Sequence, residues 1–158
     1  MKEPPKENQK FCAVIPVYRH EAASRQVALA LHNEGLAVVL VDDGNSPEGH
    51  AILESIANEI PETFLVTHTV NKGKGGAVIS GLIEAARLGY THAFQIDADG
   101  QHDLNAIPFF VKASKKHPCS VISAYPQYDA TVPKSREQGR KITNFWVCVE
   151  TLSMSLPD

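Results

Sequence analysis

The sequence over residues 92–103 reads HAFQIDADGQHD, and the other motifs of the chain are arranged around it. The apolar residues in its first half indicate a short buried strand that stops at two aspartates. Side chains two positions apart on a strand point to the same side, so we expect Asp97 and Asp99 to reach one divalent cation together. Gln101 can add a further oxygen after the turn, and Mg²⁺ or Mn²⁺ prefers ligands of this kind. An aspartate-rich turn that binds nothing is the structural alternative.

Three other motifs that contain aspartate or bind nucleotides do not match the residues of this sequence. An EF-hand loop beginning at Asp97 needs glycine and glutamate where His102 and Pro108 stand. A phosphatase of the haloacid dehalogenase type needs threonine or valine in place of Gln101, and its motif follows the first strand rather than a late one. A dinucleotide-binding Rossmann unit needs a G-x-G-x-x-G turn after the first strand, where residues 16–20 read PVYRH.

Length and charge set the broad class of the protein. The 158 residues suffice for one substantial core, and we expect residues 11–158 to form one domain behind a flexible lead-in at residues 1–10. The net charge of −3 excludes the basic field that is typical of nucleic-acid binders. No apolar run approaches the roughly 20 residues that a membrane span needs. The three cysteines lack metal-ligand spacing, so we expect a reducing, cytoplasmic location, at the membrane surface in the full-length protein.

Predicted strands and helices alternate along the chain. Strands are expected at residues 11–17, 36–41, 64–70, in the stretch that ends at the two aspartates, and at 120–124. Helices are expected at residues 21–33, 47–60, from the glycine-rich loop at 71–76 to about 88, at 105–116 and at 139–155. This alternation predicts an α/β fold with a mainly parallel sheet, in which ligands bind beyond the carboxyl ends of the strands.

Polar residues follow each of the first four predicted strands. Tyr18 follows the first strand, Asp42 and Asp43 the second, residues 71–74 the third and residues 97–101 the fourth. Because these ends share one edge of a parallel sheet, their coincidence indicates a binding site more strongly than any one motif does.

The motifs together resemble the family 2 glycosyltransferases, in particular the dolichyl-phosphate mannose synthase-like branch. The resemblance rests on PVY at 16–18, VDDG at 41–44, NKGKG at 71–75, Gly81 and DADGQH at 97–102, in this order. It implies a GT-A fold, which is a Rossmann-like three-layer sandwich with a mainly parallel sheet. It also implies a UDP- or GDP-sugar donor, a Mg²⁺ or Mn²⁺ cofactor, and transfer with inversion at the anomeric carbon.

The resemblance assigns roles to single residues. Asp97 and Asp99 match the family's metal-binding DxD motif, and Gln101 matches a further metal ligand of this branch. Asp42 and Asp43 match the pair that holds the base and the ribose. A capped turn before the next helix is the alternative for this pair.

Further donor contacts are implied at Pro16 and Tyr18, which match the first nucleotide-contacting loop, and at Ala98 within the DxD motif. Lys74 matches the lysine of the glycine-rich loop, where a cation beside free helix amides favours a diphosphate. A solvated surface lysine is the alternative for Lys74. The chain departs from the family at His20, where many relatives are acidic, and at residues 123–126, where the branch has Gly-Ser/Thr-Arg. Lys134, Arg136 and Arg140 are candidates for the missing positive charge.

The resemblance also implies acceptor-side elements that the chain lacks, so we expect a truncated, donor-binding half of the enzyme. The acceptor of the intact protein is expected to be a lipid-linked or saccharide hydroxyl or phosphate. No catalytic base is assigned, because His102 and Asp103 are expected on the leaving-group side. Residues 145–156 are expected to expose an apolar face and to mediate self-association.

Two other functions are open at this point. A sugar-1-phosphate nucleotidyltransferase has a similar sheet but needs a glycine-rich loop after the first strand, and residues 16–21 contain no glycine. A non-catalytic module that binds nucleotide sugars is compatible with the same motifs.

Overall fold

The computed structural model describes residues 9–123 of the chain. By its internal contacts the chain divides into two compact units, Met1–Ile122 and Ser123–Asp158, and the structural detail belongs to the first. The predicted helix at 139–155, the apolar segment at 145–156 and the three candidate cations at 134, 136 and 140 lie outside the described residues.

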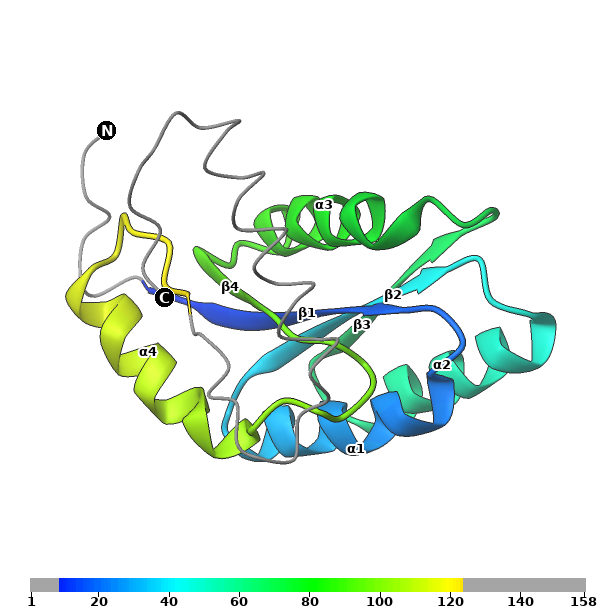
Figure 1. Cartoon of the computed structure of the whole chain (residues 1–158), viewed down its shortest axis with the longest axis horizontal. Coiled ribbons are helices and arrows are strands. Elements are labelled where there is room, and N and C mark those ends of the chain that lie inside the picture. Colours follow the sequence, from blue (N-terminus) through cyan, green and yellow to red (C-terminus); the bar gives the residue numbers. More distant parts are fainter. Residues whose placement is uncertain (1–8, 124–158) are drawn as a thin grey trace, which may run out of the picture. The chain divides into compact units, whose positions relative to one another are not determined.

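The described unit is a parallel sheet covered by helices on both faces. The strands are β1 (Phe11–Val17), β2 (Ala37–Asp43), β3 (Thr63–His68) and β4 (His92–Gln95). They pair in parallel in the order β3-β2-β1-β4. The helices are α1 (Glu21–Asn33), α2 (Pro47–Glu59), α3 (Gly73–Arg87), the short 3₁₀ turn η2 (Leu104–Ala106) and α4 (Ile107–Lys116). Figure 1 shows α3 on one face of the sheet and α1, α2 and α4 on the other. The predicted α/β class with a parallel, three-layer arrangement is confirmed.

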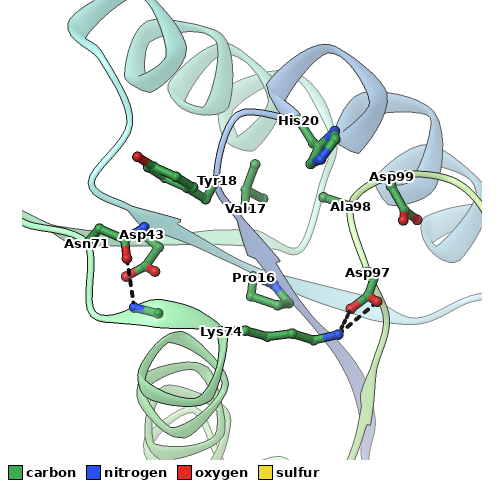
Figure 2. A pocket seen from close by; sticks show the side chains of 11 residues that line it. Pro16, Val17, Tyr18, His20, Asp43, Asn71, Lys74, Asp97, Ala98 and Asp99 are labelled. Atoms are coloured by element: carbon green, nitrogen blue, oxygen red, sulfur yellow. Dashed lines mark hydrogen bonds and ion pairs between the residues drawn. The ribbon is translucent and has the colours of Figure 1, made fainter. Parts of the chain in front are cut away.

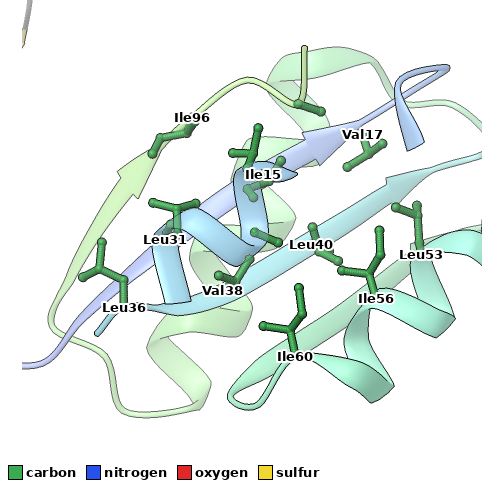
Figure 3. Close-up of a cluster of buried hydrophobic side chains, with 14 of the residues drawn as sticks. Ile15, Val17, Leu31, Leu36, Val38, Leu40, Leu53, Ile56, Ile60 and Ile96 are labelled. Carbon is green, nitrogen blue, oxygen red and sulfur yellow. The ribbon is translucent and has the colours of Figure 1, made fainter. Parts of the chain in front are cut away.

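The alternation of side chains along β2 divides the interior into two cores. Val38 and Leu40 pack in a cluster with residues of α1, α2 and α4, part of which is drawn in Figure 3. Val39 and Val41 point the opposite way and pack with residues of α3. Every residue of this strand is buried, as expected for a parallel strand with helices on both faces.

Local sequence signals explain where the helices begin and how closely they pack. The hydroxyl of Ser46 accepts a hydrogen bond of 3.2 Å from the backbone N–H of Gly49, and Pro47 occupies the first turn of α2. Gly81 lets α3 approach the sheet, because a Cβ at this position would overlap the side chain of Val14 and press on Val41.

Four of the five strand predictions were wrong in extent or existence. β2 continues to Asp43 instead of ending at residue 41, so Asp42 and Asp43 lie on the strand, and β3 ends at His68 instead of residue 70. β4 ends at Gln95, so Asp97 and Asp99 stand in the loop after the strand rather than on it. Residues 120–123 form no strand, and Val121 is 95 % exposed. Its apolar side chain therefore gains nothing from burial to offset the entropy of ordering the backbone. Among residues 9–123, no helix is long and apolar enough to cross a membrane.

Candidate functional site

An open cavity of about 360 Å³ lies at the edge of the sheet where the parallel strands end. Its lining comes from the carboxyl ends of β1 and β2 and from the segments that follow β1, β3 and β4, so all four strand ends contribute, as the sequence predicts (Figure 2). The lining residues are Pro16, Val17, Tyr18, His20, Asp43, Asn71, Gly73, Lys74, Asp97, Ala98 and Asp99. Of the donor- and metal-binding residues selected from the sequence within residues 9–123, only Asp42 and Gln101 do not line it.

An ion pair between Lys74 and Asp97 joins two sides of the cavity lining. The Lys74 Nζ atom lies 2.6 Å from Asp97 Oδ1 and 2.8 Å from Oδ2. Gln95 Nε2 donates to the same carboxylate at 2.7 Å, and His102 Nε2 lies 3.5 Å from Oδ2. Partial burial raises the pKa of Asp97, but the hydrogen bond and charge of Lys74, helped by Gln95 and His102, outweigh it. The pKa of Asp97 is therefore held below its ordinary value, and the group is a carboxylate at neutral pH.

The position of Asp99, the second aspartate of the motif, is set by a turn and not by the alternating side-chain directions of a strand. Asp99 Oδ1 accepts a hydrogen bond of 3.0 Å from the backbone N–H of Gln101. The same-face argument for the pair was therefore wrong in its geometry, although both carboxylates line one cavity. The side chain of Gln101 is exposed and lies outside the lining.

The donor atoms in this part of the cavity fit a hard divalent cation. Asp97 and Asp99 provide carboxylate oxygens, the ligands that Mg²⁺ and Mn²⁺ prefer. Within residues 9–123, no group of three or more His, Cys, Asp or Glu side chains is gathered for a metal. Two carboxylates suit a Mg²⁺-type site, which ordinarily completes its coordination with water and substrate phosphates.

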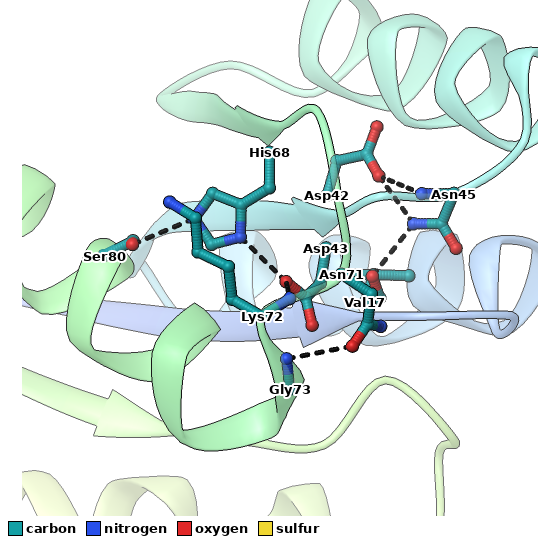
Figure 4. Close-up of polar contacts among 9 residues, drawn as sticks. All are labelled: Val17, Asp42, Asp43, Asn45, His68, Asn71, Lys72, Gly73 and Ser80. Atoms are coloured by element: carbon teal, nitrogen blue, oxygen red, sulfur yellow. Dashed lines mark hydrogen bonds and ion pairs between the residues drawn. The ribbon is translucent and has the colours of Figure 1, made fainter.

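Asp42 is turned inward and holds the turn after β2. Its Oδ1 accepts from the backbone N–H and the side-chain amide of Asn45 at 2.9 and 2.7 Å, and its Oδ2 lies 2.7 Å from His50 Nδ1. Burial raises the pKa of Asp42, but these hydrogen bonds outweigh it, so the pKa is below its ordinary value. The same Asn45 amide donates to the backbone oxygen of Val17 at 2.9 Å, which ties this turn to the end of β1 (Figure 4).

Asp43 faces the other way and contributes to the cavity. Its Oδ1 lies 2.7 Å from His68 Nδ1 and accepts the backbone N–H of Lys72 at 2.9 Å. The next amide, that of Gly73, donates to Asn71 Oδ1 at 2.9 Å. These contacts fix the start of α3, where helix amides and the nearby lysine favour an anionic ligand.

Sequence reasoning missed the polar partners that hold this edge together. Asn45, His50 and His68 carry no motif, and each acts through an aspartate. The register of the sheet contains the signal for one of them, because Asp43 and His68 are direct neighbours across β2 and β3.

Comparison with known proteins agrees with this architecture. The model of the family described as glycosyl transferase family 2 matches residues 12–152. The UDP-N-acetylglucosamine--dolichyl-phosphate N-acetylglucosaminyltransferase of Methanococcus voltae is 32 % identical over 102 residues, which cover 56 % of this chain and 41 % of that protein. The polyprenol monophosphomannose synthase of Mycolicibacterium smegmatis is 31 % identical over 98 residues, covering 60 % and 37 %.

A third relative has a similar name and a similar span. The undecaprenyl-phosphate mannosyltransferase of Micrococcus luteus is 31 % identical over 107 residues, which cover 66 % of this chain and 44 % of that protein. The chain thus spans about two fifths of the length of the curated relatives it matches. Because the family model covers most of the chain, the chain belongs to glycosyl transferase family 2.

Proposed function

We propose that this chain is the donor-binding part of a metal-dependent, inverting glycosyltransferase that transfers a sugar from a UDP- or GDP-sugar to a polyprenyl phosphate. The observation that carries the proposal is the meeting of Lys74, Asp97 and Asp99 in one cavity at the strand ends. The names of all three relatives pair a sugar with a polyprenol or its phosphate, which supports a lipid phosphate as the acceptor. Such an acceptor would bring the full-length protein to a membrane surface.

The charges in the cavity suit a nucleoside diphosphate and its cation. Asp97 and Asp99 would hold Mg²⁺ or Mn²⁺, which when bound neutralises negative charge on the departing diphosphate. Lys74 follows the first residue of α3, so its ammonium group and the helix amides act on the same side of a diphosphate. The cavity therefore offers negative charge to the metal and positive charge to the phosphates of one ligand.

The opposite part of the cavity suits the nucleoside. The ring of Tyr18 is partly exposed beside the cavity, and its flat surface can support a base. Asp43 can accept a hydrogen bond from a ribose hydroxyl or a base N–H, because one of its oxygens is held internally and the side chain still lines the cavity. Asp42 has the different task of holding the turn that presents Asp43.

The chemistry of the acceptor determines whether a base is needed. A hydroxyl acceptor needs a general base to remove its proton. A polyprenyl phosphate attacks as an oxyanion, so no proton has to be removed from the attacking atom. His102 stands beside Asp97 at 3.5 Å and thus on the side of the departing diphosphate, where it is unsuited to activate an acceptor entering from the opposite face.

Calorimetric titration of the 158-residue chain with UDP, GDP, UDP-N-acetylglucosamine and GDP-mannose tests the proposal. Each titration is done with Mn²⁺ and again with EDTA. We expect nucleotides of one base to bind, and binding to weaken when the metal is removed. Failure of every nucleotide to bind in the presence of Mn²⁺ would refute donor binding by this chain.

A further inference from the structure

A buried imidazole at the end of β3 connects three elements around the cavity. The side chain of His68 is 4 % exposed, and its two ring nitrogens lie 2.7 Å from Asp43 Oδ1 on β2 and 2.9 Å from Ser80 Oγ on α3. A carboxylate can only accept, so Nδ1 of the ring donates to Asp43. In the neutral ring Nε2 then accepts the hydroxyl hydrogen of Ser80. Figure 4 shows the ring between its two partners.

The carboxylate oxygen that His68 holds has a second task. Asp43 Oδ1 also accepts the backbone N–H of Lys72, the residue that caps the start of α3 and has no capping side chain of its own. In residues 9–123, neither a hydrogen bond nor an ion pair engages Asp43 Oδ2. His68 and the Lys72 amide thus engage the same oxygen of Asp43.

The loop before α3 is packed tightly against the same turn. Gly44 has a φ angle of 76°, and a Cβ at that position would lie 2.6 Å from the backbone nitrogen of Asn71. Rotation of the Asp43 side chain would therefore release the Lys72 amide from a loop that has little space to readjust. Lys74 stands two residues further on, so the placement of its ammonium group depends on the same anchor.

Asp43, His68 and Ser80 have the composition of a hydrolytic triad, but they do not act as one. Ser80 is not part of the cavity lining, so its hydroxyl does not meet a ligand there. Asp43, at the other end of the series, is the member that reaches the cavity. In this series Ser80 contacts His68, His68 contacts Asp43, and Asp43 lines the cavity.

We propose that His68 is a positioning residue for donor binding: it fixes the orientation of Asp43, so that one carboxylate oxygen holds the Lys72 amide and the other meets the nucleoside. The inference rests on the proposed function, because the ligand that Asp43 meets is the nucleotide. His68 itself touches neither the cavity nor the reacting atoms.

Two substitutions of His68 test the contacts of its two ring nitrogens separately. The amide nitrogen of asparagine lies near the place of Nδ1 in histidine, so His68→Asn keeps a donor for Asp43 and loses the contact with Ser80. The amide of the longer glutamine lies near Nε2, so His68→Gln keeps the contact with Ser80 and loses the one with Asp43. Ser80→Ala is the matched control, because it removes the partner of Nε2 and leaves Asp43 untouched.

The first readout is hydrogen exchange of the Lys72 amide, followed by NMR in the absence of nucleotide. We expect His68→Gln to lose the protection of this amide, and His68→Asn and Ser80→Ala to keep it. The second readout is the Kd of UDP and GDP with Mn²⁺. We expect His68→Gln to raise the Kd on the order of ten-fold, the effect of a lost hydrogen bond to a charged group. Equal losses in the asparagine and glutamine variants, in proportion to their loss of stability, would overturn the inference.

A measurement on the unsubstituted chain covers the case in which the variants do not fold. Long-range ¹H–¹⁵N spectra show which ring nitrogen of His68 carries the hydrogen. We expect hydrogen on Nδ1, and a neutral ring protonated only at Nε2 would overturn the inference. The inference and the proposed function fail separately. Selective loss of Lys72 protection in His68→Gln, with no binding of UDP or GDP to the wild-type chain, supports the orientation of Asp43 by His68 and refutes the donor site. Equal nucleotide binding by His68→Gln and His68→Asn supports the donor site and refutes the positioning role of His68.

Discussion

The ammonium group of Lys74 lies within 2.8 Å of both carboxylate oxygens of Asp97. The glycine-rich segment at the start of α3 is thus joined to the loop after β4 by this ion pair. The lysine side chain is 60 % exposed and the aspartate 31 %, and ion pairs in such positions contribute little to stability. We therefore expect the pair to affect ligand binding in the cavity more than the stability of the fold. A divalent cation and the Lys74 ammonium group would compete for the same two oxygens.

We predict that Lys74→Gln raises the affinity of the chain for Mn²⁺ alone. The substitution removes a competing positive charge, which at this separation in a wet site corresponds to roughly a five-fold change in Kd. Electron paramagnetic resonance of free Mn²⁺ measures the effect. Lys72→Gln is the control, since Lys72 precedes the same helix and has no ion pair among residues 9–123. Equal Mn²⁺ affinities of the two variants would contradict the competition.

The charge-neutral variants Asp97→Asn and Asp99→Asn are expected to fold and to lose the Mn²⁺-dependent part of nucleotide binding. Asparagine at position 99 still accepts the Gln101 amide, so the turn is preserved while the charge is removed. Gln101→Ala is expected to have a smaller effect, because the Gln101 side chain lies outside the cavity. Calorimetry with and without Mn²⁺ checks all three. A metal dependence unchanged in both aspartate variants would refute the metal assignment.

Asp42→Ala is expected to act on stability rather than on the ligand. Removal of the partner of Asn45 and His50 should lower the free energy of unfolding by about 1–3 kcal/mol, while the folded fraction binds nucleotide as before. Urea denaturation gives the first quantity and calorimetry the second. A large loss of nucleotide affinity with unchanged stability would show that Asp42 meets the ligand directly.

The pH dependence of stability gives a separate test of Asp42. Its folded-state pKa is depressed, so its contribution is present above the unfolded value of about 4 and is lost as the pH falls through the folded pKa. The difference in unfolding free energy between wild type and Asp42→Asn should therefore shrink as the pH falls below about 4. Glu59→Gln is the comparison: Arg25 and Ser55 lower the pKa of Glu59 to about 2, but this side chain is exposed, and its loss should change stability much less. A difference for Asp42→Asn that persists at low pH would contradict a depressed pKa of Asp42 in the folded protein.

Two glycines of α3 should respond to alanine in opposite directions. At Gly81 the added methyl group meets Val14 and Val41, and overpacking of this kind costs about 1–3 kcal/mol. At Gly75 nothing lies within 4 Å of the added atom, and the higher helix propensity of alanine should stabilise the protein by up to about 1 kcal/mol. Thermal and urea unfolding of the two variants measures the contrast. Equal stabilities would show that α3 packs less closely on the sheet.

The sequence was sufficient for the four strands and four α-helices of the described residues 9–123, and for the edge at which the site lies. Apolar runs, the Ser46 cap and the glycines that end helices mark the alternation of strands and helices, and alternation leads directly to a parallel sheet. The end of β4 was not predictable in the same way. Ile96 is still buried and still donates its backbone N–H to the backbone oxygen of Val14, so the apolar pattern and one hydrogen bond to β1 both continue one residue beyond the end of β4.

The separate roles of the two aspartates at the end of β2 could be assigned only from the structure. Neighbouring residues on a strand point to opposite faces, so only one of Asp42 and Asp43 can face α3 and the cavity. Asp43 shares the face of Val41, which packs on α3, whereas Asp42 is on the face of α1 and α2. His68 was missed because its importance comes from the register of β2 and β3, which no local pattern encodes.

The most direct test of the account is paramagnetic broadening of the amide NMR signals by Mn²⁺ together with UDP or GDP, with Mg²⁺ as the diamagnetic reference. We predict that broadening is strongest at residues 97–101, extends to residues 71–75 and 16–20, and is absent from the outer face of α2. The same experiment on Asp97→Asn should show no selective broadening. Broadening centred on any other part of the chain, or none with either nucleotide, would contradict a metal–nucleotide site at the carboxyl edge of the sheet.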